Sequence, residues 1–132
     1  MEEQKNHLID NEFVPYELAV KLKELGFDKP CLSYWDDDKV FELNPEFLKG
    51  SEMDSTWLTR PTFSQAFRWF RENHRLSVLI HDCLDDYVGE IVEWSITEIK
   101  ISHQVPNRIE TYEEVELECL KKLIEIVESK EK

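Results

Sequence analysis

The sequence predicts an α+β fold, with about three helices packed on a small, mainly antiparallel sheet of about four strands. Apolar residues recur at helical spacing in three segments, and start signals precede these segments. The predicted order is helix, hairpin, helix, two strands and helix, which differs from the regular alternation of a parallel sheet. Residues 1–12 are polar, and we expect them to form a flexible N-terminal segment. Because 132 residues suffice for one hydrophobic core, we expect a single domain over residues 13–132.

The first helix is predicted over residues 14–27, followed by a hairpin. Pro15 suits the first helical position, where its missing N–H costs nothing, and Gly26 suits a left-handed stop. The stretch "CLSYWDDDKVFELN" then shows two short alternating runs on either side of a polar turn over residues 36–39. This pattern favours two antiparallel strands.

Two capping boxes predict the starts of the second and third helices. Thr62 with Gln65, and Thr111 with Glu114, have the T-x-x-Q/E spacing in which side chains satisfy the first backbone N–H groups. Between these helices, "LSVLIHD" and "EIVEWSITEIKIS" read as strands joined by a turn at "CLDDYVG". The second helix is amphipathic, and its predicted buried face comprises Phe63, Ala66, Phe67 and Phe70.

The chain is strongly acidic, with 29 acidic and 16 basic residues and a formal net charge of −13. Such a charge repels nucleic acid and anionic membranes, so we expect no strong direct nucleic-acid binding by the chain alone and no membrane association. The cysteines at positions 31, 83 and 119 lack metal-ligand spacing and are expected to be free buried thiols. No export signal or long apolar run is present, which predicts a cytoplasmic protein.

The stretch "RPTFSQAFRWFRENHR" holds four of the five arginines. Arg68, Arg71 and Arg75 fall on one predicted helix face, with Arg60 near its start and Trp69 at the edge of the apolar arc. An ordinary solvated face that pairs with the chain's own acids is the favoured interpretation. Contact with the phosphates or carboxylates of a partner is the alternative, and we count these five residues as candidate partner-binding residues.

The last predicted helix carries a row of glutamates opposite its apolar arc. A solvated face is the commoner outcome for such a row. The alternative is a surface that docks on a positively charged nucleic-acid channel of a partner. The candidate partner-binding residues here are Glu114, Glu118, Glu125 and Glu128.

No catalytic motif stands out, so the sequence predicts a protein that is not an enzyme and needs no cofactor or metal. The best candidate for a metal-dependent hydrolase is the cluster His81, Asp82, Asp85 and Asp86, with Cys83 beside it. Short acidic side chains at a turn explain this cluster more simply. The same holds for Asp36, Asp37 and Asp38, because one hairpin tip rarely supplies the oxygens that calcium needs.

Three blocks carry a family resemblance: "FVPYELAVKLKELGFDKPC", "RPTFSQAFRWFRENH" and "TYEEVELECLKKLIEIV". In combination they resemble a family of small acidic proteins of phages and prophages of Bacteroidetes-type bacteria. Its "P-T-x-x-Q-A-F-x-W-F-R-E" block matches residues 61–72, and its "T-Y-E-E-A-E-x-x-C-L-x-x-L-I" block matches residues 111–124 except at Val115, where the family has alanine. The region 90–110 departs from the family in being longer and more charged. No catalytic residues are carried over.

The resemblance implies a role in countering host defence, in the cytoplasm of an infected bacterium. The chain is similar to anti-CRISPR proteins of this phage group, one of which acts on type VI-B RNA-guided RNA nucleases. The implied partner is such a nuclease or its complex with guide RNA, bound through charged surface. An accessory or regulatory protein-binding module without a defence role is the alternative, and the metal-dependent hydrolase is a third possibility.

Overall fold

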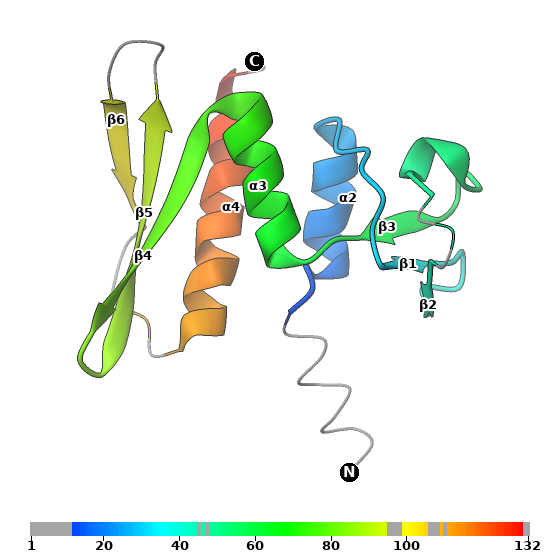
Figure 1. Cartoon of the computed structure of the whole chain (residues 1–132), viewed down its shortest axis with the longest axis horizontal. Helices are drawn as coiled ribbons and strands as arrows, with labels where there is room; N and C mark the ends of the chain where they lie inside the picture. The colour runs from blue at the N-terminus through cyan, green and yellow to red at the C-terminus, as the bar shows by residue number, and fades with distance from the viewer. Residues whose placement is uncertain are drawn as a thin grey trace. The chain divides into compact units, whose positions relative to one another are not determined.

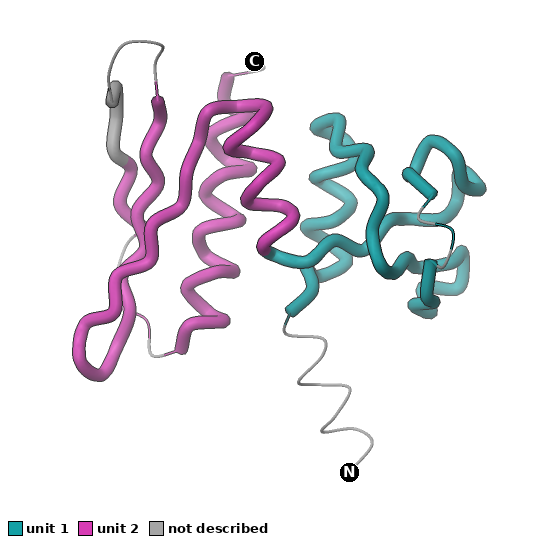
Figure 2. Tube along the Cα trace, viewed as in Figure 1, with its two compact units in different colours: residues 1–63 teal, residues 64–132 magenta. Residues whose placement is uncertain are grey.

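The structure, a computed structural model, describes residues 12–44, 46, 48–94, 99–105, 109 and 111–130. Apart from Glu12, the predicted flexible segment lies outside the described residues. The described part contains three α-helices and six strands, which confirms the α+β class. The strands form two three-stranded antiparallel sheets in place of the expected sheet of about four. Contacts group the chain into two compact units, residues 1–63 and 64–132 (Figure 2), and each unit is described by itself.

Helix α2 (Tyr16–Glu24) of the first unit begins directly after Pro15, which has an extended backbone. At its other end, Gly26 has a φ of 103°. Its N–H donates to the Lys23 carbonyl at 3.1 Å, and the Phe27 N–H donates to the Leu22 carbonyl at 2.9 Å. These two bonds form the left-handed helix stop that the sequence predicts.

The sheet of the first unit has the order β2-β1-β3, with β1 spanning Ser33–Trp35, β2 Phe41–Leu43 and β3 Leu58–Arg60. The predicted hairpin is β1 and β2, with Trp35 opposite Phe41. Strand β3 was not predicted, because three residues are too few to show an alternating pattern. Helix α2 packs on this sheet, and the rings of Tyr16 and Trp35 meet edge to face at 5.1 Å.

The second unit is built around the antiparallel sheet β4-β5-β6. Its elements are helix α3 (Phe63–His74), β4 (Leu76–Cys83), β5 (Asp86–Trp94), β6 (Ile99–Gln104) and helix α4 (Tyr112–Lys130). Helix α4 runs along β5 and β4 (Figure 1). The long strand predicted over 90–102 is in fact parts of two paired strands, β5 and β6. The predicted turn at residues 83–89 is also shorter, since β4 and β5 pair up to a two-residue loop at Leu84 and Asp85.

Helix α4 approaches β5 closely at Gly89. A Cβ atom at this position would lie 2.6 Å from Cys119 Sγ and 3.1 Å from Val115 Cγ2. Cys119 and Val115 are fully buried and form a core cluster with Val105, against which Phe67 of α3 also packs. The missing side chain of Gly89 therefore allows the contact between helix and sheet.

We predict that Gly89→Ala destabilises the protein by about 1–3 kcal/mol, the usual cost of overpacking a core. Chemical denaturation of the purified variant measures this loss. Combining it with Cys119→Ala removes the closest clashing atom, so the double variant should lose less stability than the two single losses combined. Strict additivity would show that helix and strand do not meet at this position.

Candidate functional site

Helix α3 carries fewer exposed arginines than its sequence suggests. Arg68 and Arg71 are exposed, and Arg68 Nε donates to Glu72 Oε1 at 2.9 Å. Arg75 lies after the helix end, with a left-handed φ of 57°, so it does not continue the helical face. The expected stripe of three is thus a pair of arginines, one of which is already bound to an acid.

Arg60 and Trp69 do not lie on the surface. The Arg60 side chain is buried, and its guanidinium carbon lies 4.3 Å from the ring centre of Phe13 and 4.4 Å from that of Phe41. Trp69 is buried, and its ring meets Phe70 at 5.0 Å. Arg60 belongs to strand β3, which the sequence did not reveal. We therefore remove both residues from the exposed candidate surface.

We predict that Arg60→Ala lowers the free energy of unfolding by about 2 kcal/mol, because cation–π contacts are strongest for a desolvated guanidinium. Arg71→Ala is the matched control, since this exposed arginine should change stability by no more than about 0.5 kcal/mol. Urea denaturation of both variants provides the comparison. Equal losses would contradict the structural role of Arg60.

Two of the four glutamates in the acidic row on α4 form ion pairs with lysines of the same helix. Glu114, Glu118 and Glu125 are exposed and Glu128 is half-buried. Lys121 Nζ lies 3.3 Å from a Glu118 oxygen, and Lys122 Nζ lies 3.5 Å from a Glu125 oxygen. Lysines on the same helix thus partly neutralise the middle of the row. Glu114, in the first turn, has no basic side chain within 4.0 Å in the part of the chain that the structure describes.

The first turn of α4 lies beside the end of the β4–β5 hairpin. Tyr87 joins the two segments: its ring meets the Tyr112 ring at 5.6 Å, and its N–H donates to the Ile109 carbonyl at 2.8 Å. Figure 1 shows the beginning of α4 next to the lower part of this hairpin. Acids from two distant stretches of sequence are therefore brought to one end of the second unit.

We call this group the acidic end, and it comprises Asp82, Asp85, Glu113 and Glu114. All four side chains are exposed, and none has a basic partner among the described residues. Asp82 is paired across the strands with Tyr87, so it lies on the face of the sheet that carries Tyr87 and α4. The sequence indicated Glu114 alone as a binding candidate, because the contact between hairpin and helix is tertiary.

The proposed hydrolase residues do not converge. His81 and Asp82 are consecutive in β4 and therefore point to opposite faces of the sheet. The His81 ring nitrogen lies 3.4 Å from a Glu90 oxygen. The group of potential metal ligands found among the described residues is instead Asp36, Asp37 and Asp38.

That group has a turn-forming role. Asp36 Oδ1 accepts hydrogen bonds from the N–H groups of Asp38 at 2.9 Å and Val40 at 3.1 Å. An aspartate side chain that binds backbone groups two residues on is a common turn device. These contacts agree with the expected hairpin turn.

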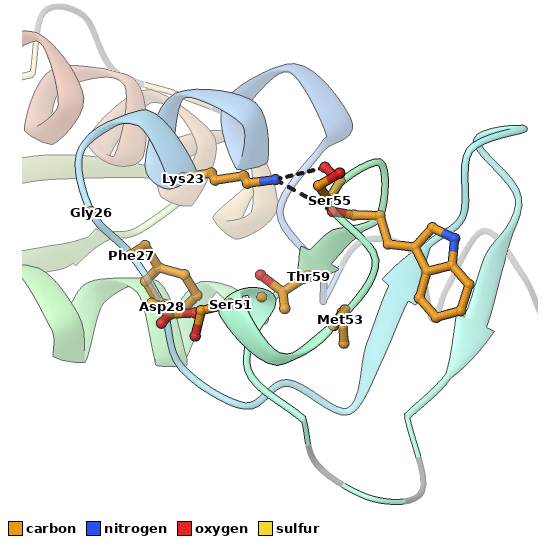
Figure 3. A pocket seen from close by; sticks show the side chains of 10 residues that line it. Lys23, Gly26, Phe27, Asp28, Ser51, Met53, Ser55 and Thr59 are labelled. Atoms are coloured by element: carbon orange, nitrogen blue, oxygen red, sulfur yellow. Dashed lines mark hydrogen bonds between the residues drawn. The ribbon is translucent and has the colours of Figure 1, made fainter.

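The first unit contains a surface pocket of about 330 Å³ (Figure 3). Phe27, Met53 and Trp57 form part of its wall. Lys23 Nζ contacts the backbone carbonyls of Ser55 and Trp57 at 3.4 and 3.5 Å. Figure 3 shows Lys23 on one side of the pocket with these contacts as dashed lines. The contacts connect the end of α2 with the segment before β3. Sequence reasoning did not find this pocket.

Asp28, on another side of the pocket, holds the connection in a similar way. Its Oδ1 accepts a hydrogen bond from the Ser51 N–H at 2.9 Å. The Ser51 hydroxyl and N–H lower the pKa of the Asp28 carboxyl below its ordinary value of 3.8, because both bonds favour the charged form. Both charged groups of the pocket therefore bind the protein's own loop.

The lowered pKa of Asp28 predicts a pH-dependent contribution to stability. The ionised carboxylate stabilises the folded state above the unfolded pKa, and this gain is lost as pH falls through the lower folded pKa. Asp28→Asn should therefore melt at a lower temperature at neutral pH, and the difference from the parent should shrink below about pH 4. Asp37→Asn, which alters an exposed carboxylate of the hairpin turn, serves as the control. A difference independent of pH would contradict this role.

The three cysteines are free thiols, as expected. Cys31 and Cys119 are buried, whereas Cys83 near the hairpin end is only partly so. Burial, with Glu116 and Glu118 nearby, raises the pKa of the Cys119 thiol to about 12. Cys119 is therefore a protonated core residue and a poor nucleophile at neutral pH.

Comparison with known proteins adds no relative: no protein-family model, curated protein or solved structure gives a significant match to the chain. Among the described residues, no helix is long and apolar enough to cross a membrane.

Proposed function

We propose that this protein is a non-enzymatic binding protein that docks its acidic end on a positively charged surface of another macromolecule. The observation that carries the proposal is the set of four exposed carboxylates, Asp82, Asp85, Glu113 and Glu114, without basic partners among the described residues. A basic surface that binds these carboxylates gains favourable charge–charge interactions. The net charge of −13 adds long-range attraction to such a surface.

The dipole of helix α4 explains the presence of only two of these four acids. Acids in the first turn of a helix are stabilised by the helix dipole, which favours Glu113 and Glu114 in the folded protein. That effect does not extend to Asp82 and Asp85, which lie on the hairpin. Their exposure beside the helix start therefore favours a binding role for the whole group.

The arginines of α3 support a binding role less well. Arg68 is already paired with Glu72, and Arg75 lies outside the helix. A partner that bound Arg68 would have to displace Glu72, which leaves Arg71 as a single exposed arginine on the helix without an acid within 4.0 Å among the described residues. The acidic end is therefore the preferred docking surface.

The proposed partner is an RNA-guided RNA nuclease of host defence, of the type VI class. This choice rests on the resemblance to phage proteins and on charge complementarity. A nuclease holds its RNA phosphates in a basic groove, and clustered carboxylates present a similar negative field to that groove. Occupying the groove or its rim would inhibit the enzyme. The alternative is an accessory module that uses the same surface on another basic partner.

Co-expression with a type VI nuclease and its guide RNA tests the proposal. We expect the tagged protein to co-purify with the nuclease complex and to reduce RNA cleavage. Asp85→Lys with Glu113→Lys should weaken binding by at least about tenfold, because charge reversal replaces attraction with repulsion.

The matched control is Glu118→Lys with Glu125→Lys. This variant makes the same change in net charge on carboxylates that already pair with lysines. It should weaken binding by less than about threefold. If the nuclease does not co-purify and cleavage is unchanged, the defence role is wrong. If both variants weaken binding equally, the acidic end is not the docking surface.

A further inference from the structure

Strand β2 and its flanks expose four large apolar side chains. The exposed fractions are 79% for Leu43, 56% for Val40, 55% for Leu32 and 45% for Phe41. All three residues of β2 are exposed, and this strand lies at the edge of its sheet. An exposed apolar edge strand is a site where another strand can pair.

The edge also presents backbone groups in the right arrangement. The Asp36 N–H donates to the Val40 carbonyl at 2.9 Å, and the Asn44 N–H donates to the Leu32 carbonyl at 2.9 Å. Antiparallel pairing alternates, so Val40, Glu42 and Asn44 direct their backbone groups toward β1. The N–H and C=O groups of Phe41 and Leu43 therefore point outward, toward the free edge.

The two faces of the edge differ in chemistry. Phe41 and Leu43 lie on the same face as Trp35 and Ser33, their partners in β1. Glu42 lies on the opposite face with Tyr34, whose hydroxyl donates to Glu42 Oε2 at 3.3 Å. A strand added beside β2 would meet apolar side chains on one face and a carboxylate on the other.

Acids also flank β2, although the charged residue nearest its start is Lys39, whose Nζ lies 5.0 Å from the centre of the Tyr16 ring. Asp37 and Asp38 are exposed before the strand, and Glu46 is exposed after it. None of these three acids has a basic partner within 4.0 Å among the described residues. Antiparallel pairing of two copies of β2 about its centre would place Glu42 opposite itself and Asp38 opposite Glu46. Charge therefore disfavours a second copy and favours a basic occupant.

We propose that β2 is a docking edge for an extended segment of a partner protein, with apolar residues alternating with Lys or Arg. The segment adds a fourth strand to the sheet β2-β1-β3. Its backbone pairs with Phe41 and Leu43, its apolar side chains pack on theirs, and its basic side chains meet Glu42. This surface belongs to the first unit and does not depend on the acidic end, so either proposal can fail alone.

The test uses a short synthetic peptide of alternating valine and lysine, titrated into the full-length protein and followed by NMR. We expect the amides of Phe41 and Leu43 to shift and become protected from hydrogen exchange. A peptide with glutamate in place of lysine should bind at least about tenfold more weakly. No protection at millimolar peptide, or equal binding of both peptides, would overturn the proposal.

Leu43→Lys should reduce binding of the valine–lysine peptide by at least about tenfold, since it removes an apolar contact and adds a repelling charge. Leu84→Lys is its matched control: this leucine is fully exposed, on the hairpin of the other unit, and its replacement should leave binding unchanged. Because both leucines are exposed, both variants should fold, which their melting curves verify. Equal effects of the two variants, or self-association of the parent protein through β2 in sedimentation, would also refute the proposal.

Discussion

The close approach of helix α4 to strand β5 at Gly89 is the contact on which the arrangement of the second unit depends. There the Cys119 sulfur occupies the space that a side chain would need. The helix is thereby held along β5, and its first turn comes beside the β4–β5 hairpin, where Tyr87 and Tyr112 meet. Acids that are about thirty positions apart in the chain become one surface only because of this packing.

Which charged side chains are paired within the protein matters more for partner binding than the net charge of the chain. On α4, lysines three residues away from Glu118 and Glu125 reduce the field of the middle of the helix. Glu72 does the same for Arg68 on α3. The carboxylates at the acidic end and around β2 have no such partners among the described residues. Exposed charges that the protein does not pair itself are the ones available to a partner.

Local signals in the sequence predicted local structure well. Gly26 ends α2 as expected, and the Thr111 hydroxyl accepts a hydrogen bond from the Glu114 N–H at 3.2 Å at the start of α4. Contacts between distant segments of the chain were harder to predict from the sequence. Strand β3 is too short to show a pattern, so Arg60 was assigned to the surface although it lies between Phe13 and Phe41. The acidic end and the β2 edge likewise arise from pairing that no single stretch of sequence reveals.

The acidic end is the proposed contact with a basic surface of the partner. Hydrogen–deuterium exchange on the complex with a type VI nuclease and its guide RNA tests it most directly. We expect slower exchange at residues 82–86 and 112–114 in the complex, with little change over α3. Slower exchange confined to α3, with none at the hairpin end or the start of α4, would contradict it.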